Sequence, residues 1–388
     1  MADVHALLKG KTLADRAREL PGDINAVDLA RATGGVITAQ HSATDPSIDL
    51  AERAAREAAM MAGIDPAGLT AYIGTSKGAV HALSAAFASR QPKENRSALC
   101  PAPPRDADLA VALGPHGYLS HHLRQRLRLN VIHHHVAACA SSLIALHHAR
   151  HSLLYPSPSS DTRNNDCVVV ATSEASLLPQ FIHSYRRLGV LAPQTPDAYN
   201  ERPMDQSRQG FVLCETGAAV LLKRVPIDQP PLPGETELLG TATACEAFDI
   251  IRPGPTMPAL SRIAEKLFTG RTIDVIHPHA PGTPDHDPAE LNTYADVLKH
   301  TGQAESPELY ACKGALGHGL GAAGLSALVL ACLCAKTRQR PPMPWLREPI
   351  DSPLSLNPQA SPLKPSSTHA VFAAGFAGHT AGALLKHH

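Results

Sequence analysis

The chain has 388 residues, 44% of them hydrophobic, and its 35 basic residues balance 35 acidic ones. This length and apolar content suffice for two core-forming units. The zero net charge gives no general reason to expect nucleic acid or an anionic membrane as a partner.

Cysteine usage and apolar patterning indicate the cellular context. The eight cysteines form no CxxC pair and no regular framework, which favours reduced thiols in a cytoplasmic protein. Residues 1–10 contain no apolar signal core. The longest apolar run, residues 325–335, is about half the length that spans a bilayer. We therefore expect no membrane span and a buried helix at that run.

The first half of the chain alternates predicted helices and buried strands. Residues 166–174 form a continuous apolar run, which is expected when helices cover both faces of a sheet. Helices are predicted at 13–20, 49–62 and 117–129, and strands at 34–39, 71–74, 166–174 and 218–223, with loops at 91–106 and 155–165.

Residues 131–154 change character around Cys139. Before it the residues are typical of a short strand, and after it apolar residues recur at helical spacing. The first turn of a helix carries unpaired N–H groups and a partial positive charge, which favour a thiolate. Most cysteines are buried as small hydrophobic residues, but this position and its small neighbours predict that Cys139 is a nucleophile.

The second half repeats this order after a proline-rich segment, residues 226–234, which is the best candidate for a boundary. We therefore divide the chain into halves at 1–225 and 235–388. Two successive α/β halves imply layered sheets and helices around a shared centre. The expected elements are strands at 235–245, 273–277 and 369–376 and helices at 258–268, 288–300 and 320–335.

Two further stretches combine a histidine with a tight turn. His279 lies in HPHAPGTPDHDPAE, and His318 lies in ACKGALGHGLGAAG, where small residues let a ligand approach the backbone. The pairs His277/His279 and His133/His135 have the spacing of metal ligands on a strand, but neither has a third ligand nearby, so we expect no metal. The glycine-rich stretch lacks the order of a phosphate-binding loop.

Together these motifs resemble the signature stretches of the β-ketoacyl-acyl-carrier-protein synthases. The stretches are ACASS around Cys139, HAPGTP from His279, KGALGH from Lys313 to His318, and AGFAGH around Phe376, with similarity also in RPMDQSRQGFVLCE and GTSKG. The resemblance extends from about residue 49 to the end of the chain. It implies a thiolase-like layered αβαβα fold built from two similar halves, usually dimeric.

The resemblance also implies a mechanism and assigns roles to residues. Cys139 would accept the acyl chain from a carrier-protein thioester, and His279 and His318 would bind the malonyl thioester oxygen and promote loss of carbon dioxide. The backbone N–H groups of Cys139 and the gating residue Phe376 would form an oxyanion hole. The supporting residues would be Lys313 paired with Glu290, and Thr283 at the pantetheine site.

The resemblance implies an acyl carrier protein as partner, malonyl-ACP and acyl-thioester substrates, no cofactor, and a homodimer, with a heterodimer as the alternative. Because carrier proteins are acidic, Arg186 and Arg187 are candidate carrier contacts, and Arg124, Arg126 and Arg128 form another basic cluster. We predict a decarboxylative Claisen condensation in fatty-acid or polyketide-like biosynthesis. The alternatives are a non-catalytic chain-length-type subunit and a thioester hydrolase that uses the same cysteine.

The sequence departs from the family pattern at a few positions. The usual opening strand is not recognisable. Pro281 stands where a pantetheine-binding threonine is usual, Ala374 replaces an aromatic residue, and Thr380 replaces an asparagine. These changes concern the acyl pocket and its gate, so they affect the acyl chain accepted more than the type of reaction.

Overall fold

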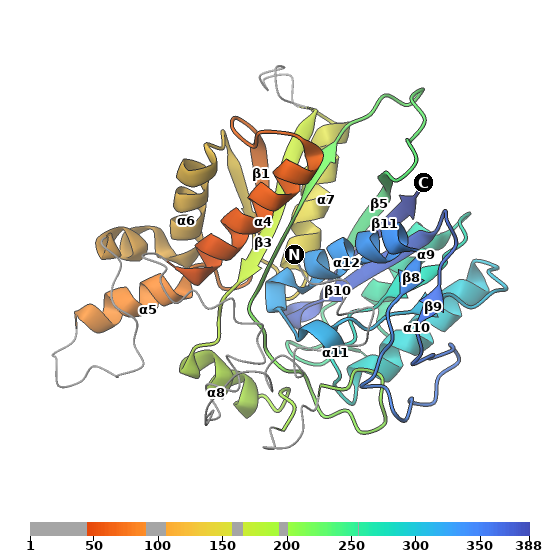
Figure 1. Cartoon of the computed structure of the whole chain (residues 1–388). Helices are drawn as coiled ribbons and strands as arrows, with labels where there is room; N and C mark the ends of the chain where they lie inside the picture. The colour runs from red at the N-terminus through yellow and green to blue at the C-terminus, as the bar shows by residue number, and fades with distance from the viewer. Residues whose placement is uncertain (1–44, 91–105, 157–165, 194–200, 255) are drawn as a thin grey trace.

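A computed structural model describes residues 45–90, 106–156, 166–193, 201–254 and 256–388. It contains two β-sheets with helices between them and on their outer faces (Figure 1). The elements expected at 13–20 and 34–39, the opening strand, and most of the loops at 91–106 and 155–165 lie outside the described residues.

The first sheet has the strand order β2-β1-β3-β4. Its strands β1 (Thr70–Gly74), β2 (Ile132–His135) and β3 (Cys167–Glu174) are parallel, and β4 (Thr216–Lys223) is antiparallel to β3. Parallel strands end at the same edge, so the residues that follow β1, β2 and β3 are brought together.

The second sheet has the order β5-β11-β10-β6-β7. Here β10 is parallel to β6, β6 is parallel to β7, and β11 is antiparallel to both β10 and β5. The strands are β5 (Thr236–Cys245), β6 (Val275–His277), β7 (Glu308–Leu309), β10 (Thr368–Ala374) and β11 (His379–His387), and a separate ribbon pairs β8 (Gln339–Arg340) with β9 (Ser361–Pro362).

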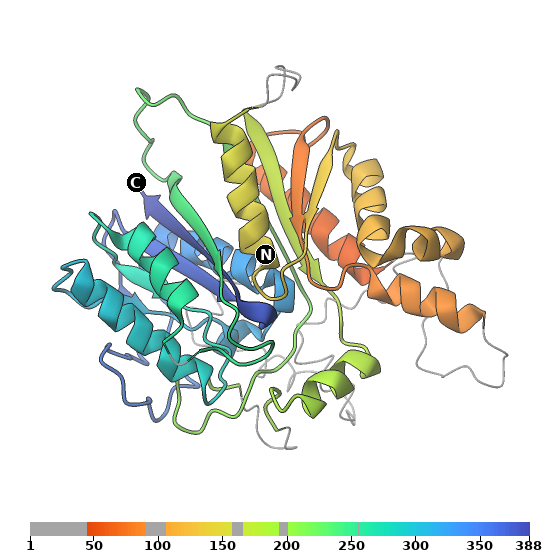
Figure 2. The same cartoon turned by 180° about the vertical axis from the view of Figure 1, so that it is seen from behind.

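Helices α7 (Ser141–Leu154) and α12 (Ala323–Thr337) form the central layer and contact both sheets (Figures 1 and 2). Helix α4 (Pro46–Ala62) covers the outer face of the first sheet with α6 (Ala107–Leu127), and α9 (Pro258–Phe268) covers that of the second with α10 (His286–His300). This arrangement gives the expected αβαβα layers. The remaining helices are α5 (Val80–Ser89), α8 (Pro179–Arg187), α11 (Lys313–Leu316) and the short 3-10 turns η3 (Leu320–Ala322) and η4 (Phe376–Gly378).

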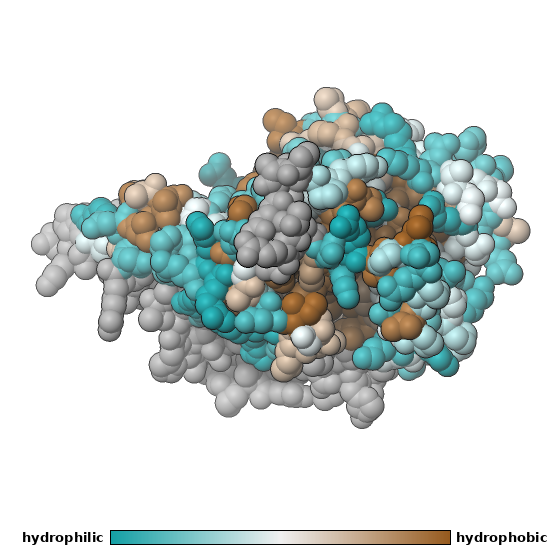
Figure 3. Space-filling model, turned by 90° about the horizontal axis from the view of Figure 1, so that it is seen from above, coloured by the Kyte–Doolittle hydropathy of each residue, from teal (hydrophilic) through white to brown (hydrophobic). Residues whose placement is uncertain are grey.

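Helix α12 is apolar around most of its surface because it is covered on both sides, whereas α7 carries serine, histidine and arginine residues among its apolar ones. Residues Leu320–Thr337 are apolar enough and long enough to cross a membrane, but 67% of this segment is buried inside the protein. Such burial is typical of a core helix. On the face of the molecule seen from above, hydrophobic side chains occur in small groups among hydrophilic ones (Figure 3).

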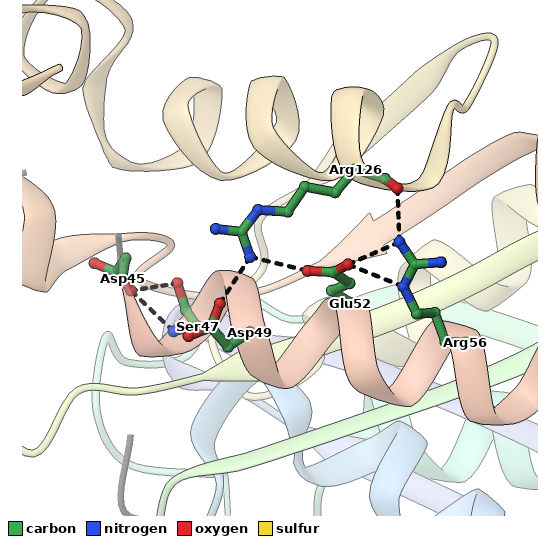
Figure 4. Close-up of polar contacts among 6 residues, drawn as sticks. All are labelled: Asp45, Ser47, Asp49, Glu52, Arg56 and Arg126. Atoms are coloured by element: carbon green, nitrogen blue, oxygen red, sulfur yellow. Dashed lines mark hydrogen bonds and ion pairs between the residues drawn. The ribbon is translucent and has the colours of Figure 1, made fainter. Parts of the chain in front are cut away.

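The ends of α4 follow local capping rules. The Asp45 carboxylate accepts a hydrogen bond from the Ser47 N–H at 2.9 Å, and Gly63 ends the helix in the left-handed region. Arg126 of α6 pairs with Asp49 at 2.7 Å and with Glu52 at 2.9 Å (Figure 4). This part of the basic cluster Arg124/Arg126/Arg128 is therefore occupied by carboxylates of the same chain and serves helix packing.

Candidate active site

Cys139 lies in a tight turn between β2 and α7, as the sequence predicted. Ala138 adopts a positive φ of 47°. The Ser141 hydroxyl accepts a hydrogen bond from the Ala137 N–H at 2.8 Å and donates one to the Ala138 carbonyl at 2.6 Å. A Cβ atom at Gly74 would lie only 2.5 Å from the Ser141 carbonyl oxygen, so β1 presses directly on this turn. Two neighbouring segments therefore fix the position of the cysteine.

The thiol of Cys139 is 7% exposed and packs in an apolar cluster. Burial raises its pKa to about 12, although Lys313 opposes this shift. Burial therefore favours the protonated thiol in the free protein, while the partial positive charge expected at the helix N-terminus acts towards the thiolate. The buried members of the cluster besides Cys139 are Leu177, Ile182, Tyr185, Phe211, Leu213 and Leu320.

The rings of His279 and His318 meet beside this cluster. Their centroids lie 5.4 Å apart with an interplanar angle of 74°. The backbone of His318 is held by Val212 and Cys214, through hydrogen bonds of 2.7 and 3.2 Å. The Phe211 ring also contacts His318, at 4.6 Å between centroids. The two loops that carry histidines therefore converge, as the motifs predicted.

Both imidazoles are neutral in this environment. Burial, and after it the positive charge of Lys313, hold the pKa of His279 and of His318 well below the usual value. The Nδ1 atoms of both rings are buried and accept no hydrogen bond from the described residues. A neutral imidazole carries one N–H, so each ring can donate one hydrogen bond to a substrate oxygen.

Lys313 and Glu290 hold the His279 loop from two sides. The Lys313 ammonium donates a hydrogen bond to the His279 carbonyl oxygen. The Glu290 carboxylate accepts hydrogen bonds from the N–H groups of His279, at 2.6 Å, and Ala280, at 2.7 Å. Burial opposes ionisation of Glu290, but the nearby His286 ring and hydrogen bonds from Tyr294 and the backbone keep its pKa below the usual value. Among the described residues the two form no direct ion pair, so they meet through the His279 backbone instead.

Cys139 and both histidines line one cavity of about 340 Å³. Thr283 and Phe376 line it too, as do the three departures from the family pattern, Pro281, Ala374 and Thr380. A Cβ atom at Gly375 would lie 3.0 Å from the Cys139 nitrogen, so the Phe376 loop lies against the backbone of the nucleophile. The cavity therefore gathers residues from five of the six sequence stretches that carry the family resemblance.

Other predicted residues lie elsewhere. Lys313 and Glu290 are buried behind the cavity, and Arg186 and Arg187 are exposed at the end of α8. Neither arginine lines the cavity. The described residues contain no group of three or more His, Cys, Asp or Glu side chains arranged to hold a metal ion.

Sequence reasoning missed several residues around the cavity. Phe211 packs on His318, and the ring of His286 lies 5.0 Å from that of His279 and contacts Glu290 at 3.5 Å. His286 could have been recognised from the sequence. It precedes Glu290 by four residues, a spacing that places both side chains on one face of a helix. Phe211 lies in the stretch RPMDQSRQGFVLCE, but nothing in that stretch assigned it a role beside His318.

The layered fold, with its cysteine turn and paired histidine loops, defines a thiolase-like protein. Solved structures of known ketosynthases have a similar fold. A type II polyketide ketosynthase in complex with its acyl-carrier protein matches with a TM-score of 0.72 and 20% identity, covering 89% of this chain and 86% of that one. The ishigamide ketosynthase/chain length factor matches with a TM-score of 0.67 and 23% identity, covering 89% and 83%.

The chain belongs to the β-ketoacyl synthase family. Family models match residues 9–226, as "Beta-ketoacyl synthase, N-terminal domain", and 237–346, as "Beta-ketoacyl synthase, C-terminal domain". It is 28% identical to a hybrid PKS-NRPS synthetase of Neonectria sp. over 64% of its length, and 25% identical to 3-oxoacyl-[acyl-carrier-protein] synthase 2 of Coxiella burnetii over 55%. The chain spans 6% of the first relative and 51% of the second.

Proposed function

We propose that the protein is a 3-oxoacyl-[acyl-carrier-protein] synthase-type acyltransferase that performs decarboxylative Claisen condensation in fatty-acid or polyketide-like biosynthesis. The observation that carries this proposal is the convergence of Cys139, His279 and His318 on one cavity. The family membership supports the same class of reaction.

In the first half-reaction the Cys139 sulfur attacks the carbonyl carbon of an acyl thioester. A new carbon–sulfur bond forms, the thioester bond to the carrier breaks, and the proton of the thiol leaves with the carrier sulfur. The adjacent N–H groups of Cys139 and Phe376 are the candidate donors to the oxyanion. Because burial favours the protonated thiol, the proton leaves as the sulfur attacks the thioester carbonyl.

In the second half-reaction a malonyl thioester loses carbon dioxide. The electron pair of the broken carbon–carbon bond passes to the thioester as an enolate, whose oxygen accepts hydrogen bonds from His279 and His318. The enolate carbon then attacks the acyl carbonyl, and the Cys139 sulfur leaves as a thiolate that takes up a proton from water. Neutral donors fixed in the cavity are effective here because they stabilise negative charge that develops on the thioester oxygen only as carbon dioxide leaves.

The partners follow from the same proposal. The substrates are acyl and malonyl groups on an acyl carrier protein, with Arg186 and Arg187 as candidate contacts for its acidic surface. The working form is a homodimer in the cytoplasm. One solved relative is named as a ketosynthase in complex with its carrier protein, and another as a ketosynthase/chain length factor, which supports a carrier partner here.

The proposal is tested by incubating the full chain with acyl and malonyl carrier protein and measuring intact mass and products. We expect an acyl adduct on Cys139 and a product two carbons longer. No adduct would support the non-catalytic subunit. An adduct that yields only free acid would support the thioester hydrolase.

A further inference from the structure

A buried carboxylate of α10 joins the 201–210 segment to the segment that follows His279. Asp287 is fully buried, and each of its oxygen atoms accepts a hydrogen bond from a backbone N–H group, Oδ2 from Met204 at 2.7 Å and Oδ1 from Gly282 at 3.0 Å. Met204 adopts a positive φ of 66°, which is uncommon for a residue with a side chain. One carboxylate therefore holds two turns that come from distant parts of the sequence.

The 281–285 segment forms one wall of the cavity that contains Cys139. Its residues that line the cavity are Pro281, Thr283, Pro284 and Asp285. Gly282 is buried, with a positive φ of 78°, and a Cβ atom there would lie 2.9 Å from the Gly210 carbonyl oxygen. The Gly210 N–H also donates a hydrogen bond to the Gly282 carbonyl at 2.8 Å. The wall is therefore packed tightly against the 201–210 segment.

Arg208 holds the same wall through its carbonyl groups. The guanidinium donates hydrogen bonds to the carbonyl oxygen of Thr283 at 3.2 Å and to that of Pro284 at 2.7 Å. Asp287 thus binds an N–H group of the wall and Arg208 binds its carbonyl groups. Lys313 and Glu290 hold His279 through separate contacts, so the wall and the histidine have different supports.

The charge of Asp287 depends on its surroundings. Burial raises its pKa to about 6, although the Met204 N–H, His286 and Arg208 oppose this shift, whereas Glu290 adds to it. An ionised carboxylate accepts hydrogen bonds at both oxygens, but a protonated one carries an O–H group in place of one acceptor. Asp287 therefore binds both N–H groups fully only when it is ionised.

We infer that Asp287 is a positioning residue for the pantetheine arm of the thioester substrates, because it fixes the 281–285 wall along which the arm reaches Cys139. This inference rests on the proposed function and adds to it a residue that acts on substrate binding rather than on the reacting atoms. The arm binds more weakly as Asp287 takes up a proton. A thioester without an arm does not use the wall, so its reaction with Cys139 is independent of Asp287.

The test measures acylation of Cys139 in the full chain by intact mass with two donors. One is hexanoyl-pantetheine, and the other is S-ethyl thiohexanoate, which has the same reacting group but no arm. Both donors react with the same thiol, so its ionisation cancels in the ratio of their second-order rate constants. We expect this ratio to rise about tenfold from about pH 5 to about pH 7.5, the size of one hydrogen bond to a charged group, with a midpoint near pH 6.

A variant assigns the change to Asp287. Asp287→Asn keeps the shape of the side chain but replaces one acceptor with an amide donor. At about pH 7.5 it should raise the half-saturating concentration of hexanoyl-pantetheine about tenfold, leave the rate with S-ethyl thiohexanoate unchanged, and remove the pH dependence of the ratio.

Asp45→Asn is the matched control. Asp45 is also a buried carboxylate whose pKa is raised by burial, and its oxygens also accept hydrogen bonds from two backbone N–H groups, of Ser47 at 2.9 Å and Ala82 at 2.8 Å. It lies before α4 in the first half (Figure 4) and does not line the cavity. Asp45→Asn should therefore keep both the ratio and its pH dependence.

Four outcomes would overturn a claim. A ratio that does not change with pH in the unmodified chain overturns the role of Asp287, and this measurement does not depend on the folding of a variant. A ratio that still changes with pH in Asp287→Asn assigns the effect to another group, such as His286, and overturns it too. An equal loss of hexanoyl-pantetheine binding in Asp45→Asn does the same. Absence of any adduct, together with no condensation product from carrier-bound substrates, overturns the proposed function itself, which makes the two failures distinguishable.

Discussion

The two sheets share one topology but carry different chemistry. The arrangement β2-β1-β3-β4 matches β7-β6-β10-β11, with two parallel pairs followed by one antiparallel pair. Cys139 follows β2, and Lys313 follows the equivalent strand β7. Lys77 follows β1, and His279 follows the equivalent strand β6.

This comparison shows how one arrangement of strands supports two tasks. The first half contributes the nucleophile, while the second contributes both histidines and the groups that hold them. The second sheet also has β5, for which the described residues of the first half provide no counterpart. The predictions below test this division of labour.

Removal of the nucleophile should have the largest effect. Cys139→Ser should lower condensation by about a thousandfold or more, because a serine hydroxyl is a much weaker nucleophile than a cysteine thiol. Steady-state product formation measures this. The matched control is Cys167→Ser, a partly buried cysteine at the start of β3, which should retain activity; equal losses in both variants would contradict the assignment.

Changes in the second half should separate the two half-reactions. His279→Ala and His318→Ala should each lower condensation by about 10² to 10³-fold, because each removes one donor to the enolate. Acylation of Cys139 should persist, as measured by intact mass. If the acyl adduct disappears as completely as the product, the histidines do not act on the malonyl step alone.

Loss of the Lys313 hydrogen bond that holds the His279 loop should lower condensation less than loss of a histidine. Lys313→Met removes the donor to the His279 carbonyl, and the displaced ring should lower condensation about a hundredfold. Lys313→Arg, which keeps a donor, should recover part of the rate. A loss of melting temperature without a change in kcat would show that Lys313 only stabilises the fold.

Two buried histidines of the second sheet should make the free energy of unfolding depend on pH. His277 of β6 and His369 of β10 are buried and hydrogen-bonded at 3.1 Å. Burial holds the pKa of His277 well below its usual value and lowers that of His369 to about 4. The equivalent strands β1 and β3 contain no histidine. In the first sheet such residues lie on β2, where burial lowers the pKa of His134 to about 3 and that of His135 to about 4, so His369→Gln removes only part of the acid dependence.

Below a pH of about 6.5 these two histidines bind protons in the unfolded chain but stay neutral in the folded protein. The free energy of unfolding is therefore fully retained above this pH and decreases as the pH falls below it. Each histidine should contribute a slope approaching about 1.4 kcal/mol per pH unit between pH 6 and pH 4. Denaturant unfolding across this range measures the slope, and His369→Gln should make it shallower. An unchanged slope would contradict the assignment.

Charge reversal on α8 should have the smallest effect. Arg186→Glu should raise KM for carrier-bound substrate by about fivefold, because exposed ion pairs contribute little. KM for a pantetheine thioester should not change. Arg224→Glu, an exposed arginine paired with Asp166, is the control, and an equal effect there would place the carrier surface elsewhere.

Much of the fold and site was predictable because the motifs are local. The strand, turn and helix around Cys139 follow from spacing, and His279 and His318 follow from their motifs. Boundaries were less accurate: the helix expected at 117–129 is observed as α6 (Ala107–Leu127), with a kink at Gly114. The strand β11 (His379–His387) was not predicted, because its Ala and Leu content favours a helix and only pairing with β10 and β5 makes it a strand.

The contact between Asp287 and Met204 was not predictable for a different reason. The two residues are separated by a long stretch of chain, and no spacing rule relates them. The direct Lys313–Glu290 pair was expected from family resemblance, yet the two residues meet through a backbone unit of a third segment. Such relations depend on how the layers assemble, which a linear pattern does not contain.

The central helices α7 and α12 have a consequence for any attempt to split the chain. One hydrophobic cluster contains residues from both helices and both sheets. Each half of the chain therefore depends on the other to complete this part of its hydrophobic core. A cut within the proline-rich link at 226–234 should leave two fragments that precipitate when produced alone. Produced together, they should recover a single soluble particle, as complementing fragments do.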